Sequence, residues 1–132
     1  MSTRPSLLIV DDEISVARTL AMVFENEGYH VTEAHSYAEA VERLAKPTKF
    51  DVVMTDLNME RPDIGLDVAR AAQLLTPRPV VVICTGYASE SNLDRAFKMK
   101  VDYVATKPAD LKELTGAMRR LLSFRQRMTG QS

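Results

Sequence analysis

The sequence has little of several features that mark particular classes of protein. It has one cysteine, Cys84, so no intrachain disulfide can form, and its place at the end of an apolar run indicates a small core residue in a reducing compartment. Its 5 glycines and 6 prolines are too few for a fibrous or disordered chain. Its 17 basic and 18 acidic residues give a net charge of −1, which argues against a protein that coats nucleic acid through bulk charge.

Long hydrophobic runs are also missing. The run 80–84 is far shorter than the roughly 20 residues that span a bilayer. The acidic residues 11–13 follow a short apolar run directly, so we expect no signal peptide, and we expect a cytoplasmic protein without membrane contact. A chain of 132 residues fits one domain of about 100–150 residues. We place that domain at 1–125 and expect a frayed polar tail at 126–132.

Short apolar runs alternate with longer helical patterns along the whole chain. The runs are nearly continuous in apolar character, which is typical of strands that helices cover on both faces. Gly28 ends the first helical pattern, Ser36-x-x-Glu39 opens the second as a capping box, and Asp110-x-x-Glu113 opens the last. The pattern after the fourth run, from Leu93, is the weakest. The predicted strands are 7–10, 30–34, 52–55, 80–84 and 103–106.

This alternation predicts an α/β fold with a doubly wound five-stranded parallel sheet, because right-handed crossovers allow little else. In such a sheet the ligand site lies beyond the carboxyl ends of the strands. Polar side chains follow four of the five predicted strands. They are Asp11 and Asp12 after the first, Asp56 after the third, Thr85 after the fourth, and Lys107, before Pro108, after the fifth.

These residue types suit phosphoryl chemistry. Three carboxylates at one edge would repel one another and raise each other's pKa unless a cation joined them, and Mg²⁺ is the natural complement. An aspartate can attack a phosphoryl group, while a metal and Lys107 would neutralise the transferring charge. Taken singly, each residue has an ordinary reading: Asp12 as a helix cap, Asp56 as a loop residue, Lys107 as a solvated charge. Together, at four strand ends, they favour a phosphoryl site.

The same segments resemble a known family. The stretches 8–13 (LIVDDE) and 51–59 (DVVMTDLNM), with Thr85-Gly86 and Thr106-Lys107-Pro108, are similar to the motifs of response regulator receiver domains in two-component signalling. The resemblance covers about residues 6–124 and is closest in kind to single-domain chemotaxis regulators. It implies a flavodoxin-like (βα)5 fold with strand order 2-1-3-4-5.

The resemblance also implies a ligand set for Mg²⁺. Asp12 and Asp56 would bind the ion directly, Asp11 would act through water, and the backbone carbonyl of Asn58 would complete the shell. No other cofactor is implied.

For the phosphoryl group, the resemblance implies that Asp56 is the acceptor from a histidine kinase, a phosphotransfer protein or a small phosphodonor. Lys107 would pair with the phosphoryl oxygens, Thr85 would hydrogen-bond to one of them, and the Lys107–Pro108 bond would be cis. The fourth helix, fifth strand and fifth helix would form the switched surface for an unknown downstream protein. We expect a signalling phosphoprotein with limited self-phosphorylation and autodephosphorylation, not a metabolic enzyme, and leave a homodimer open.

The sequence departs from the family pattern in three respects. The aromatic residue usual three positions before the lysine is Val104 here, and Tyr103 would face the other way. Tyr87 is either a replacement for that aromatic residue or an exposed loop residue. After Asp56, Glu60 and Ile64 stand where Pro and Gly are usual, which indicates one extra residue in the loop. We also expect no DNA-binding or enzymatic output domain in these 132 residues.

Three other functions remain as alternatives. A Mg²⁺-dependent aspartyl-phosphate phosphatase of the haloacid dehalogenase type would need a second Asp two residues after the nucleophile, where this chain has Asn58. A nucleotide- or flavin-binding module would need glycines and backbone amides after the first strand, and this chain has acids. A phosphorylation-independent interaction module with a receiver shape is supported only by Val104.

Overall fold

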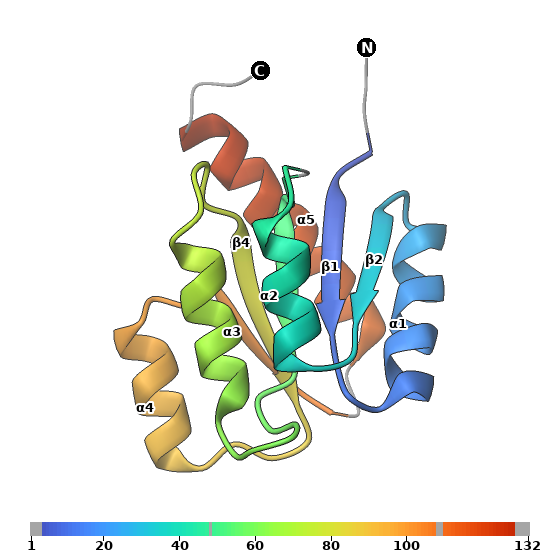
Figure 1. Ribbon diagram of the computed structural model, residues 1–132. Coiled ribbons are helices and arrows are strands. Elements are labelled where there is room, and N and C mark those ends of the chain that lie inside the picture. The colour runs from blue at the N-terminus through green and yellow to red at the C-terminus, as the bar shows by residue number, and fades with distance from the viewer. Residues whose placement is uncertain (1–3, 48, 108–109, 129–132) are drawn as a thin grey trace.

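The computed structural model describes residues 4–47, 49–107 and 110–128 of the chain (Figure 1). Strands and helices alternate strictly along it, as the sequence predicts. In chain order they are β1 (Ser6–Val10), α1 (Ile14–Asn26), β2 (His30–Ala34), α2 (Tyr37–Ala45), β3 (Val52–Thr55), α3 (Ile64–Gln73), β4 (Val80–Thr85), α4 (Glu90–Lys98), β5 (Tyr103–Thr106) and α5 (Leu111–Met128).

The strands form one five-stranded sheet in the order β2-β1-β3-β4-β5, and all four pairings are parallel. The predicted fold class and strand order are therefore confirmed. The chain turns from β1 to β2 on one side and returns to β3 on the other, so the strand order reverses between β1 and β3. Ligand sites of open α/β sheets form at such a point, beyond the carboxyl ends of the strands.

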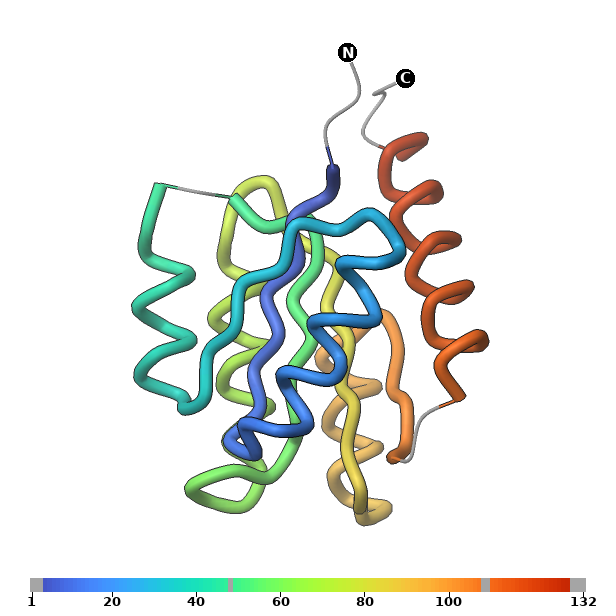
Figure 2. Tube along the Cα trace, turned by 90° about the vertical axis from the view of Figure 1, so that its right-hand side faces the viewer, coloured from blue at the N-terminus to red at the C-terminus, as the bar shows by residue number. Residues whose placement is uncertain are grey.

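Helices cover both faces of the sheet. Figures 1 and 2 show α1 and α5 on one face and α2, α3 and α4 on the other. Each face buries its own core: Phe24 and Met118 pack on the first, Phe50 and Val68 on the second. Cys84 is buried in the first core, which confirms its prediction as a small core residue. β3 and β4 are buried along their whole length, and β1 is buried from Leu7 to Val10.

The helix boundaries follow local signals. Gly28 has a φ of 100°, the left-handed conformation that ends a helix, so that prediction is confirmed. The capping box predicted at Ser36-x-x-Glu39 forms in part: Ser36 Oγ accepts a hydrogen bond from the Glu39 amide, but the Glu39 carboxylate accepts from the His35 amide instead of the Ser36 amide. Asp110 likewise accepts from the Glu113 amide at the start of α5. None of the helices in the described ranges has the length and hydropathy needed to cross a membrane.

Two further predictions concern the tail at 126–132 and the Lys107–Pro108 bond. The helix continues through Met128, so residues 126–128 of the expected frayed tail are helical. Three turns of α5 already pack on the sheet through Leu114, Met118 and Leu122, and helical hydrogen bonding carries on past them. The predicted cis bond at Lys107–Pro108 lies outside the described residues.

Candidate functional site

The backbone hydrogen bonds of the sheet continue into the residues that follow the strands. The Asp11 amide donates to the Ala34 carbonyl (3.0 Å), and the Asp56 amide donates to the Val10 carbonyl (2.9 Å). The Lys107 amide donates to the Thr85 carbonyl (2.7 Å). The backbone of these residues is thereby as fixed as the sheet itself. Side chains that lie far apart in sequence meet at this edge.

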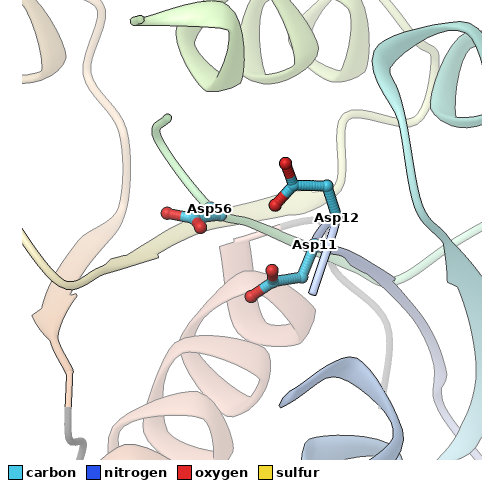
Figure 3. Close-up of side chains that lie close together, drawn as sticks. All are labelled: Asp11, Asp12 and Asp56. Atoms are coloured by element: carbon cyan, nitrogen blue, oxygen red, sulfur yellow. The ribbon is translucent and has the colours of Figure 1, made fainter. Parts of the chain in front are cut away.

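Three carboxylates converge between the ends of β1 and β3. Asp11, Asp12 and Asp56 each offer an oxygen, and these oxygens lie within 4.8 Å of one another (Figure 3). Asp11 is 2% exposed and Asp56 is 8% exposed, whereas Asp12 is exposed to solvent. The cluster is therefore set into the sheet edge and open on the side of Asp12.

Lys107 is the cation of this cluster. Its Nζ lies 2.6 Å from Asp11 Oδ2 and 3.3 Å from Asp56 Oδ2. Burial by itself would lower the pKa of Lys107, but hydrogen bonding to Asp11 and the charges of Asp56 and Asp11 outweigh burial and raise it. The ammonium is therefore charged at neutral pH and is held between two carboxylates.

The two buried carboxylates are oriented by backbone amides. Asp11 Oδ1 accepts a hydrogen bond from the Glu13 amide (2.9 Å), and Asp56 Oδ1 accepts one from the Leu57 amide (2.7 Å). Each carboxylate thus uses one oxygen locally and turns Oδ2 towards Lys107. This arrangement fixes the direction from which a ligand can approach Asp56.

Among the described residues, Asp12 lacks the cationic partner that Asp11 and Asp56 have in Lys107. Within the described part of the chain, no lysine, arginine or histidine lies within 4 Å of its carboxylate. Partial burial, then the charges of Asp11 and Asp56, raise the pKa of Asp12 above its usual 3.8. Three carboxylates against one ammonium leave an excess of negative charge. This donor set suits a hard divalent cation such as Mg²⁺, which prefers carboxylate oxygens.

Thr85 ends β4 next to this cluster and is 1% exposed. Its hydroxyl donates to the Tyr87 carbonyl (3.1 Å), so it is bonded within its own loop. The side chain of Tyr87 is 70% exposed, which fits the interpretation as a surface aromatic residue and leaves its suggested switch role a prediction.

The sequence-based interpretation of β5 is confirmed in one respect. Tyr103 packs against the α5 side and donates to Glu113 (3.1 Å), whereas Val104 packs on the α4 side against Leu57, Ile83 and Ala96. The two residues face opposite ways, so Tyr103 does not occupy the place of the missing aromatic residue.

The loop after Asp56 contains residues that sequence reasoning did not assign. Gly65 follows the extra loop residue, and its amide donates to the Leu57 carbonyl (2.8 Å). A Cβ there would overlap the Asp56 carbonyl and lie 2.7 Å from Leu57 Cα. Glu60 accepts from the Tyr37 amide at the start of α2 (2.9 Å), and Asp63 contacts α4. The sequence contains a signal for Gly65, because this glycine stands one position after the place where the family usually has one. It contains no signal for the contact of Glu60 with α2 or of Asp63 with α4.

With the geometry established, comparison with known sequences defines the class of the protein. The model of the response regulator receiver domain matches residues 7–119. The chain therefore belongs to the response regulator receiver domain family of two-component systems, whose members are signalling proteins and not enzymes of metabolism.

Individual relatives agree with this assignment. The response regulator receiver protein CpdR of Brucella abortus (strain 2308) is 29% identical over 116 residues, which cover 88% of this chain and 95% of CpdR. The transcriptional regulatory protein GlrR of Escherichia coli (strain K12) is 34% identical over 111 residues, 83% of this chain and 24% of GlrR. This chain thus spans about a quarter of the length of GlrR.

The fold is also that of solved receiver structures. A crystal structure of a CheY-like response regulator receiver domain protein from Methanospirillum hungatei JF-1 superposes with a TM-score of 0.88 at 23% identity, covering 96% of this chain and 99% of the other. At this identity the likeness supports the fold alone.

Proposed function

We propose that this receiver domain is a phosphoacceptor, with Asp56 as the acceptor residue and Mg²⁺ as the required ion. The observation that carries the proposal is the convergence of Asp11, Asp12 and Asp56 beside Lys107 at the point where the strand order reverses. Asp11, Asp12, Asp56 and the backbone carbonyl of Asn58 would hold the ion. When bound, Mg²⁺ supplies positive charge that offsets the negative charge on a transferring phosphoryl group.

The remaining chemistry belongs to the side chains of this protein. A carboxylate oxygen of Asp56 forms a bond to phosphorus, while the P–N bond of a phosphohistidine or the P–O bond of acetyl phosphate breaks. The electron pair leaves with imidazole or acetate. Lys107, charged and already within 3.3 Å of Asp56, stabilises the phosphoryl oxygens. Hydrolysis of the acyl phosphate would return the free carboxylate.

Thr85 would convert this chemistry into a change of surface. Its hydroxyl bonds to the Tyr87 carbonyl in this structure and is free to exchange that partner for a phosphoryl oxygen. An acyl phosphate brings nearly two negative charges and strong acceptor oxygens, so it favours the loop arrangement that reaches them. We propose that the readout is the surface of α4, β5 and α5, where Phe97 and Phe124 are exposed.

The phosphoryl donor follows from membership of the family. We propose a histidine kinase or a phosphotransfer protein, acting in the cytoplasm, where the single free cysteine stays reduced. Direct contact with nucleic acid is not part of the proposal, since the chain carries a net charge of −1.

Intact-mass measurement tests the proposal directly. The protein is incubated with acetyl phosphate, with Mg²⁺ and with a chelator in its place. We expect one phosphoryl adduct with Mg²⁺ and none with the chelator, and no adduct on the Asp56→Asn variant in either condition. Asp51→Asn is the matched control, because Asp51 lies at the opposite end of β3 and contacts Ser6 and Arg125.

The alternatives give different results in the same experiment. A phosphorylation-independent interaction module, which Val104 favours, would gain no adduct in any condition. A Mg²⁺-dependent phosphatase would hydrolyse its aspartyl phosphate too fast for an adduct to accumulate, while it consumes acetyl phosphate. Either result would overturn the proposed function.

A further inference from the structure

A chain of hydrogen bonds joins the loop after Asp56 to the start of α4. Asp63 occupies the N-cap position of α3, where its φ of 67° lies in the left-handed region. Its amide donates to Asn58 Oδ1 (3.0 Å). Its carboxylate accepts from Asn92 Nδ2 (2.5 Å) and from Arg95 Nη1 (3.0 Å), both on α4. We call these four residues the Asp63 bridge.

At the α4 end, the Asp63 bridge holds the helix by its first turn. Asn92 is 8% exposed, and its Oδ1 accepts from the Ser89 amide (3.2 Å), while its own amide donates to Ser89 Oγ (3.1 Å). The side-chain oxygen of Asn92 thus takes part in the cap of α4, and its side-chain NH2 group donates to Asp63. The Arg95 pair is half exposed and contributes little alone. The buried contact of Asn92 is the one that fixes α4 relative to Asp63.

At the other end, the Asp63 bridge reaches the site. Asn58 Nδ2 donates to the Tyr87 carbonyl (3.3 Å), the same atom that accepts from the Thr85 hydroxyl (3.1 Å). One side chain thus joins the loop after β3, the loop after β4 and Asp63. Any rearrangement that frees the Tyr87 carbonyl from Thr85 changes the environment of Asn58.

On β5, the side chain that packs towards α4 is Val104, which makes only apolar contacts there. Val104 is a small side chain without a polar group, packed against Leu57, Ile83 and Ala96. It has neither the ring nor the hydroxyl with which a residue at this place could report a movement of Thr85. The Asp63 bridge supplies a polar connection from the loop after β3 to α4.

We propose that Asp63 is a positioning residue that couples the state of the Asp56 site to the orientation of α4, by way of Asn58 and Asn92. The inference rests on the proposed function, because it takes phosphorylation of Asp56 as the input. In the unphosphorylated protein the Asp63 bridge holds α4 in the arrangement seen here. When Thr85 leaves the Tyr87 carbonyl, Asn58 shifts, and Asp63 passes the shift to Asn92 in the first turn of α4.

Two substitutions at Asp63 separate its side chain from its backbone conformation. Asp63→Gly removes the carboxylate, and glycine adopts the left-handed conformation without strain. Asp63→Asn keeps an oxygen that can accept from Asn92, and asparagine tolerates a positive φ. Asp94→Ala is the matched control: it removes a carboxylate that lies on α4 itself and pairs with Lys98 of the same helix at 3.0 Å, outside the Asp63 bridge.

The readout is hydrogen exchange of the α4 amides, with Mg²⁺ and with or without excess acetyl phosphate, normalised to the phosphorylated fraction from intact mass. In the unsubstituted protein and in Asp94→Ala, we expect phosphorylation to change exchange in α4 by about fivefold or more. In Asp63→Gly we expect a change below about twofold, although the adduct forms at a similar rate. Asp63→Asn should retain the response.

The outcomes distinguish the two proposals. If the unsubstituted protein gains no adduct, the proposed function fails and this inference falls with it. If the adduct forms but α4 does not respond, or if Asp63→Gly responds as fully as the unsubstituted protein, only the coupling by Asp63 is overturned. Loss of the response in Asp94→Ala, or in Asp63→Asn, would show that general weakening of α4 is responsible and would also overturn it.

Discussion

The two ends of the sheet use aspartates in opposite ways. At the amino end, Asp51 accepts from the Ser6 amide (2.8 Å) and from Arg125 (3.2 Å), and Asp102 accepts from the Val81 amide (2.8 Å). Each of these carboxylates stands apart and has its own donors. At the carboxyl end, Asp11, Asp12 and Asp56 share one space and one lysine.

This difference distinguishes acids that stand alone with their own donors from acids that are crowded around one lysine. A carboxylate that joins neighbouring strands through a backbone amide stabilises the sheet and gains nothing from other acids nearby. Three carboxylates within 4.8 Å repel one another, and a bound cation would offset that repulsion. The carboxyl end therefore differs from the amino end in the concentration of negative charge that one lysine does not fully neutralise.

The largest effect should come from the close approach of Gly65 to the backbone of Asp56 and Leu57. In Gly65→Ala the new Cβ would overlap the Asp56 carbonyl and lie 2.7 Å from Leu57 Cα, neither of which can move without disturbing β3. We expect a loss of about 3 kcal/mol or more in the free energy of unfolding, measured by urea denaturation. Gly116→Ala in α5, where only the end of the Arg120 side chain lies nearby, is the control and should be neutral or stabilising. Equal stability of both variants would contradict the close approach.

A second effect should separate the two ends by their response to Mg²⁺. An ion that binds only the folded protein raises the free energy of unfolding by about 2.7 kcal/mol at 100 times its dissociation constant. We expect Mg²⁺ to raise the melting temperature of the unsubstituted protein and of Asp51→Asn. Asp12→Asn should lose most of this increase, since it removes the open carboxylate of the cluster. An undiminished increase in Asp12→Asn would exclude Asp12 as a ligand.

The sequence predicts the carboxyl end better than the loops around it. The strands were predictable because β1, β3 and β4 are apolar on both faces, and the order of polar residues after them follows from the parallel topology. The cap of α4 could not be predicted in the same way, because Ser89-x-x-Asn92 has asparagine in place of the usual glutamate or glutamine. The left-handed conformation of Asp63 could not be predicted either, since it depends on Asn58 and α4, which only the folded chain brings together.

A smaller effect is expected at the amino end. Asp51→Ala removes the acceptor for the Ser6 amide and the partner of Arg125, and we expect it to lower the free energy of unfolding by about 1–2 kcal/mol. Phosphorylation by acetyl phosphate should proceed at the unchanged rate, because Asp51 lies at the far end of β3. A variant of normal stability with impaired phosphorylation would show that the two ends are not independent.

The smallest effect, and the most specific to the cluster, concerns Asp12 without a divalent cation. Partial burial and the charges of Asp11 and Asp56 raise its pKa in the folded protein above the 3.8 of the unfolded chain. The folded state then holds this proton more tightly, so stability due to Asp12 falls as the pH rises from about 3.8 through the folded pKa and stays reduced at neutral pH.

Removing that charge should therefore stabilise the metal-free protein. With a chelator at neutral pH, Asp12→Asn should be more stable than the unsubstituted protein by less than about 1 kcal/mol, since the side chain is exposed and solvent screens it. The gain should shrink as the pH approaches 3.8, the value at which Asp12 of the unfolded chain takes up its proton. Adding Mg²⁺ should reverse the order of the two proteins, because the ion stabilises the one that keeps all its carboxylates. Asp51→Asn, which removes an isolated acid with its own donors, should show no gain at any pH. If Asp12→Asn were no more stable than the unsubstituted protein without metal, the three carboxylates would not be in conflict, and the contrast between the two ends of the sheet would not hold.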